Sequence, residues 1–145
     1  MTMTLARHAI RRLPLLALAA LLLATAGCAG TPDRADALRE AQYAWSAAIR
    51  WGDFEGAWTL VDPAYREAHP MTALEFSRYA QVRISGYDEG PSTVSGETAT
   101  RRVVLGVVNA NTQVQRQATY LEQWRHDPDT GRWWVQSGLP DLWRD

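Results

Sequence analysis

Apolar residues recur with two different periods along residues 35–145. Over residues 36–51 they return every three or four positions, which predicts an amphipathic helix ended by Gly52. From Gln81 onward they return at every second position, which predicts strands. We therefore expect an α+β domain, with helices first and antiparallel strands after them.

Three shorter helical segments are expected between the long helix and the strands. They cover residues 54–61, 63–66 and 73–80. Thr72 and Glu75 form the capping-box pattern before the third segment. We expect Leu74, together with Phe76 or Tyr79, to face the core from this segment.

The strands are expected over residues 81–87, 98–109, 113–126 and 132–137. Turn signals separate them: Asp88-Glu-Gly-Pro91, Asn109-Ala-Asn111 and Asp127-Pro-Asp-Thr-Gly131. The seven tryptophans indicate either an aromatic core or an aromatic-lined pocket, and we favour the core. The expected core aromatics are Trp45, Trp58, Phe76, Trp124 and either Trp133 or Trp134.

A largely apolar run of 14 residues, interrupted by Thr25, covers positions 13–26. A membrane-spanning helix needs about 20 such residues, so the run is too short to be one. Arginines precede it, and the small residues Ala26 and Gly27 lead to Cys28, the only cysteine. This pattern resembles a bacterial lipoprotein signal peptide with its lipobox, although Thr25 stands where the family commonly has leucine.

The lipoprotein resemblance implies cleavage before Cys28 and acylation of that residue. It divides the chain into a signal peptide (1–27), a lipidated tether (28–34) and a domain (35–145). The expected location is the cell envelope, facing the periplasm, and Ala29 favours the outer membrane by analogy with enteric lipoproteins. An ordinary cleaved signal peptide with a chance cysteine is the alternative.

Charge excludes some classes of partner and chemistry. From Cys28 onward the chain has 12 arginines against 16 acidic residues, a formal net charge of −4. Nucleic-acid binding needs a basic surface, so we expect none. The chain contains no lysine, which excludes Schiff-base chemistry and a Walker-type phosphate loop. No metal-ligand spacing is present, and we expect no cofactor.

Two segments indicate a family. Trp51-Gly-Asp-Phe-Glu-Gly-Ala-Trp58 follows the long helix, and the strands end in Asp129-Thr-Gly-Arg-Trp-Trp-Val135. This order resembles the NTF2-like superfamily, and more narrowly small bacterial lipoproteins of that fold. The resemblance implies helices packed on a curved antiparallel sheet that forms a cone. The fold hosts isomerases, dehydratases, transport factors and binding modules, so it leaves the function open.

Candidate acid–base residues lie on the third expected strand. Tyr120, Glu122 and His126 share one strand face and would form a set at the mouth of the cone. The alternative, which we favour, places Glu122 and His126 on a solvated strand end beside Asp127. We interpret His69, which precedes a proline, as a surface-turn residue.

Three strand arginines are candidates for holding an anionic ligand: Arg101, Arg102 and Arg116. Valines alternate with Arg101 and Arg102, so one of these arginines must lie on an apolar surface. A mixture of valine and arginine on the outer sheet face would fit a homodimer or an envelope protein partner.

The sequence thus favours a membrane-anchored lipoprotein with a non-enzymatic binding or assembly role toward a partner protein or small ligand. The alternative is an isomerase or hydro-lyase of the same fold that acts on a small apolar substrate.

Overall fold

The computed structural model describes residues 33–143 of the 145-residue chain. The signal segment and Cys28 lie outside the described residues. Within them, four helices precede four strands. The elements are α2 (Arg34–Trp51), α3 (Phe54–Thr59), α4 (Pro63–Ala68), α5 (Ala73–Tyr79), β1 (Val82–Ser95), β2 (Thr98–Asn109), β3 (Gln115–Asp127) and β4 (Arg132–Val135). No helix in this part of the chain is long and apolar enough to cross a membrane.

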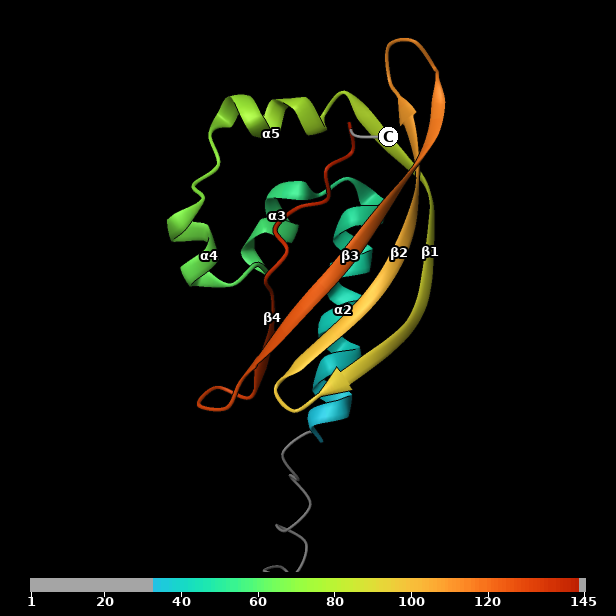
Figure 1. Cartoon of the computed structure of the whole chain (residues 1–145). Coiled ribbons are helices and arrows are strands. Elements are labelled where there is room, and N and C mark those ends of the chain that lie inside the picture. Colours follow the sequence, from blue (N-terminus) through green and yellow to red (C-terminus); the bar gives the residue numbers. More distant parts are fainter. Residues whose placement is uncertain (1–32, 144–145) are drawn as a thin grey trace, which may run out of the picture. The chain divides into compact units, whose positions relative to one another are not determined.

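The four strands form one antiparallel sheet in the order β1-β2-β3-β4. The three long strands curve around α2, and the helices lie on one side of the sheet (Figure 1). This is the α+β architecture, helices on a curved antiparallel sheet, that the pattern of apolar residues predicts.

The first strand is longer than predicted and passes through the expected turn at Asp88-Glu-Gly-Pro91. Gly90 and Pro91 of β1 together oppose Arg102 of β2, so the pairing contains a β-bulge. Proline has no N–H to donate, but a bulge on an edge strand does not require one. The prediction of a turn at 88–91 is therefore wrong, and the hairpin turns at Gly96, where φ is +58°.

The helix termini follow the predicted signals. Gly52 ends α2 with a φ of +73°, and its N–H donates to carbonyls of the last turn. Thr72 and Glu75 form the predicted capping box of α5. Leu74, however, is 76% exposed while Tyr79 is buried. Five residues correspond to about 140° around a helix, so the two side chains cannot share the core face.

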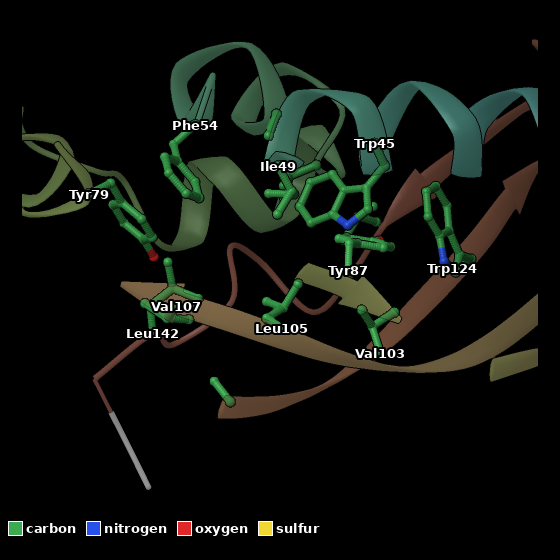
Figure 2. Close-up of a cluster of buried hydrophobic side chains, with 14 of the residues drawn as sticks. Trp45, Ile49, Phe54, Tyr79, Tyr87, Val103, Leu105, Val107, Trp124 and Leu142 are labelled. Carbon is green, nitrogen blue, oxygen red and sulfur yellow. The ribbon is translucent and has the colours of Figure 1, made fainter. Parts of the chain in front are cut away.

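The core lies between α2 and the concave face of the sheet. Trp45 and Ile49 of α2 point toward Val103 and Leu105 of β2 (Figure 2). Three of the predicted core tryptophans are buried: Trp45, Trp124 and Trp133. Trp58 and Phe76 are only half-buried and lie at the edge of the core.

The segment after β4 completes the core. Gly138, Pro140 and Leu142 are buried, and the segment passes along the helix side of the sheet toward α5 (Figure 1). The Tyr79 hydroxyl donates to the Pro140 carbonyl at 3.1 Å, and the Tyr120 hydroxyl donates to the Gly138 carbonyl at 2.6 Å. Residues 136–143 are thereby fixed against both α5 and β3.

Asp62 connects the short helices to the sheet. Its side chain accepts hydrogen bonds from the Ala64 N–H at 2.9 Å and from Arg125 Nε at 2.8 Å. Burial alone would raise the pKa of this carboxyl group. The hydrogen bond and charge of Arg125, with the Ala64 N–H, outweigh burial and hold the pKa below its usual 3.8.

Because its pKa is lowered in the folded state, Asp62 stabilises the fold above pH 4 and loses this effect as pH falls through the folded-state pKa. We expect Asp62→Asn to lower the free energy of unfolding by about 1 kcal/mol at pH 7, since Arg125 is partly exposed. Urea denaturation should show this difference shrinking below about pH 4. Asp129→Asn, in an exposed turn, is the control; a pH-independent difference for Asp62→Asn would contradict the assignment.

Candidate functional site

A buried polar network lies on the concave face of the sheet, around Glu122. Arg101 Nε and Trp124 Nε1 donate to Glu122 Oε2 at 2.9 and 3.1 Å. Arg101 also donates to Oε1 at 3.2 Å, and the Tyr87 hydroxyl donates to the same oxygen. A further bond joins Arg101 to Glu89 at 2.9 Å. Both oxygens of the Glu122 carboxylate are thus occupied by protein donors.

The charges in this network favour a stable ion pair. Burial lowers the pKa of Arg101, but the hydrogen bond and charge of Glu122 outweigh burial and raise it. Burial and the Glu122 charge both raise the pKa of Tyr87, so its hydroxyl stays protonated and donates. The arrangement resembles a satisfied structural ion pair more than a base with a free lone pair.

The prediction of a solvated strand end for Glu122 and His126 is wrong. Glu122 has no exposed surface and His126 is 9% exposed. Strand alternation places both on the concave face with Trp124. Arg101 lies directly opposite Glu122 in the β2–β3 pairing. The ion pair between them offsets the free-energy cost of burying the carboxylate.

Tyr120, Glu122 and His126 share this face, as predicted, but each has separate partners. Tyr120 bonds to the Gly138 carbonyl and to Ser137 Oγ, both at 2.6 Å. The His126 ring packs on Trp133, and its Nδ1 lies 3.2 Å from Arg34 Nη2. The described contacts do not link the three side chains into one acid–base set, and their catalytic role stays a prediction.

The three candidate arginines lie in three different environments. Arg101 belongs to the buried network, whereas Arg102 is exposed on the outer face of the sheet. Arg116 is half-buried, with Nη1 3.5 Å from the Trp143 carbonyl oxygen. They do not converge on one anion site.

A cleft of about 670 Å³ lies between the short helices and the C-terminal segment. Aromatic side chains from both segments form part of its walls, with charged and aliphatic side chains between them. The lining residues with rings or charges are Trp58, Tyr65, His69, Glu75, Arg78, Tyr79, Asp141 and Trp143. Sequence analysis did not identify this cleft, because its walls come from segments about 80 positions apart; the tryptophan content was the available signal.

The aromatic walls are held by contacts among themselves. Tyr65 stacks on His69 at 4.3 Å and meets Trp58 edge-on at 6.3 Å. Trp143 meets Tyr79 edge-on at 4.8 Å, and Arg78 lies 4.4 Å above the Trp143 ring. The cleft is therefore pre-formed.

Ionisation of Tyr79 is disfavoured at the base of this cleft. Burial, and then the charge of Asp141, raise the pKa of Tyr79 to about 12. The hydroxyl therefore keeps its proton and its bond to Pro140 at neutral pH. In the described residues, no group of His, Cys, Asp and Glu side chains is placed to hold a metal ion.

Similarity to known proteins is confined to structure. No family model and no curated protein matches the chain. A SEC-C motif containing protein from Rhodopseudomonas palustris is similar in structure, with a TM-score of 0.53 and 20% identity over 82% of this chain and 85% of that one. At this identity the likeness shows the fold alone.

Two further solved structures are similar at lower scores. One is a Streptomyces avermitilis protein of the NTF2-like family that has been proposed to be a dehydratase: TM-score 0.49, 18% identity, 72% of this chain and 93% of that one. The other is the association domain of C. elegans CaMKII. It has a TM-score of 0.38 and 22% identity, over 70% of this chain and 89% of that one.

Proposed function

We propose that this chain is a lipid-anchored protein of the bacterial cell envelope that binds a small ligand in the aromatic cleft without transforming it. Cys28 carries the lipid, and the domain faces the periplasm, with the outer membrane as the expected site. The signal-peptide pattern before Cys28 supports the location. The NTF2-like resemblance supports a binding role as well as it supports an enzyme.

The observation that carries the binding role is the cleft itself. Its volume of about 670 Å³ lies within the range of small-molecule sites. Pre-formed aromatic walls need little ordering when a ligand enters, which favours affinity. In contrast, Glu122 is fully buried, Arg101 is 6% exposed and neither lines this cleft, so the buried pair is not placed to meet a substrate there.

We also propose that the outer face of the sheet binds a second copy of this chain or an envelope protein. Arg102 and Leu121 are exposed there and lie opposite each other in the strand pairing, and Val104 is half-buried beside them. Such a mixture of apolar and arginine surface suits a protein contact.

Mass spectrometry of the protein purified from its native membranes tests both parts of the proposal. We expect a covalent mass increase from acylation at Cys28, which Cys28→Ala should abolish. We also expect a second, non-covalent mass under native conditions that is lost on denaturation. Met71→Trp should remove it, because Met71 lines the cleft and an indole there fills the space.

Leu74→Trp is the matched control, because Leu74 is exposed on α5 and does not line the cleft. It should retain both masses. A bound mass that survives Met71→Trp would refute the cleft as the site, and a protein without acyl mass would refute the anchor.

A further inference from the structure

The first half of strand β3 has an unpaired edge. On one side, β2 pairs with β3 from Gln115 to Arg125, but on the other side β4 pairs with it only from Trp124 to Asp127. Successive residues of an antiparallel strand direct their backbone N–H and C=O groups to opposite sides. Before Trp124, every second residue of β3 therefore faces the side where β4 is missing.

Two hydrogen bonds show which residues face that side. The His126 N–H donates to the Glu97 carbonyl at 2.7 Å, so the even-numbered residues of β3 face β2. The Gln123 carbonyl accepts from the Gln136 N–H at 2.7 Å, so the odd-numbered residues face away from β2. Outside the β2–β3 pairing, the described part of the chain makes no backbone hydrogen bond to three of them. These three are Gln117, Thr119 and Leu121.

The chain after β4 turns away from this edge and leaves a groove beside it. Gly138 has a φ of +68°, which lies outside the range of a strand, and Pro140 has no N–H to donate. The segment instead runs along the helix side of the sheet (Figure 1). A groove of about 570 Å³ lies between it and β3. It is lined by Gln117, Thr119 and Leu121 on the strand side and by Ser137, Leu139 and Asp141 on the other. We call this space the β3 groove.

This edge lacks the features that protect the other edge of the sheet. The edge strand β1 contains a bulge with Pro91 in it, preceded by the charged residues Asp88 and Glu89. Proline, bulges and charges on an edge discourage the addition of another strand. Residues 117–121 of β3 contain no proline, no charged side chain and no break in their pairing with β2. The edge of β3 therefore stays open to a further strand.

We propose that an extended peptide of a partner protein binds in the β3 groove as an added strand beside residues 117–121. The three open residues offer three N–H donors and three C=O acceptors, which is the chemistry that recognises an extended backbone. The strand runs antiparallel to β3, in the direction that β4 would have continued. A second copy fits less well, because its own residues 137–141 would have to share the junction between the two edges.

The charge in the groove indicates one feature of the peptide. Arg116 Nη1 lies 3.5 Å from the Trp143 carbonyl oxygen, so the end of the C-terminal segment lies near the Gln117 end of the groove. Asp141 is the charged residue among those that line the groove. Its carboxylate favours a basic residue at the end of the peptide that lies near Gln117. In an antiparallel strand this is the C-terminal end of the peptide.

Hydrogen exchange at single amides tests the proposal on the full-length chain. The probe is the synthetic peptide acetyl-Thr-Val-Thr-Val-Thr-Arg-amide, in which threonine and valine alternate and arginine comes last. A saturating amount should slow exchange by about tenfold or more at the amides of Gln117, Thr119 and Leu121, because each gains an acceptor. The amide of Val94, on the edge strand β1, should be unchanged.

Two N-methylated peptides test whether one backbone edge of the probe makes the contact. One is methylated at the threonine amides and the other at the valine and arginine amides. Only the set that faces β3 donates to it, so one methylated peptide should lose the effect and the other should keep it. No slowing with the parent peptide, or the same result with both methylated peptides, overturns the proposal.

A pair of variants at one position completes the test. Thr119→Pro removes an N–H that the fold does not use and should weaken peptide binding by about tenfold. Thr119→Ala is the matched control, since it keeps the N–H and should bind like the wild type. Equal binding by both variants overturns the proposal. Slow exchange at the three amides without peptide, if it grows with protein concentration, would assign the edge to a second copy instead.

Discussion

Replacing Glu122 with alanine is expected to lower the free energy of unfolding by about 3–5 kcal/mol. Glu122 is fully buried, and Arg101, 6% exposed, would lose its principal partner. Tyr87 and Trp124 would also lose the acceptor of their hydrogen bonds. A buried cation without its partner is destabilising because burial has already removed the water that would solvate it.

A double variant, Arg101→Met with Glu122→Leu, distinguishes the ion pair from simple packing. If the loss in the single variant comes from the unpaired arginine, the apolar pair should recover most of it. Urea denaturation of the wild type, Arg101→Met, Glu122→Leu and the double variant gives the coupling energy between the two positions. Glu97→Ala, which breaks an exposed pair with Arg34, should cost less than about 1 kcal/mol. If Glu122→Ala also lowered the free energy of unfolding by less than about 1 kcal/mol, water would have to reach the Arg101–Glu122 pair.

The secondary structure was predictable where one local signal dominated. The 3.6-residue period and Gly52 placed α2 to within two residues, and Thr72 with Glu75 placed the start of α5. The failure at 88–91 has a local cause as well. Glycine and proline are the signals of a turn, but they are also tolerated in a bulge on an edge strand. Only the partner strand decides between these two structures.

The surroundings of the candidate site were less predictable, because they depend on contacts between distant residues. Alternation placed Tyr120, Glu122 and His126 on one face, but not whether that face was buried. The burial of Glu122 depends on a strand register that sets it opposite Arg101, 21 positions earlier. Local composition around Glu122 contains no information about that register.

The cleft depends on distant contacts too. Trp58 and Trp143 line the same cleft only because residues 136–143 return to the helices after β4. The tryptophan content left an aromatic core and an aromatic pocket as alternatives, and both are present. Trp45, Trp124 and Trp133 are buried in the core, whereas Trp58 and Trp143 line the cleft.

Trp45→Ala is expected to cost about 3–5 kcal/mol, because the side chain is fully buried and its removal leaves a large cavity. Its ring packs at 6.4 Å from Tyr120 and 6.3 Å from Trp124, so α2 would lose its main contact with β3. Trp58→Ala should cost less, about 1–2 kcal/mol, because Trp58 is half-buried beside the open cleft.

Trp45→Phe separates the volume of this side chain from its polarity. The Trp45 Nε1 is buried without a hydrogen-bond partner among the described residues, so phenylalanine keeps an aromatic ring and gives up no hydrogen bond. We expect a loss below about 2 kcal/mol, between wild type and Trp45→Ala. Chemical denaturation of the three variants should rank Trp45→Ala as the least stable. If Trp58→Ala were less stable than Trp45→Ala, the core would be centred on α3 and not on the contact between α2 and β3.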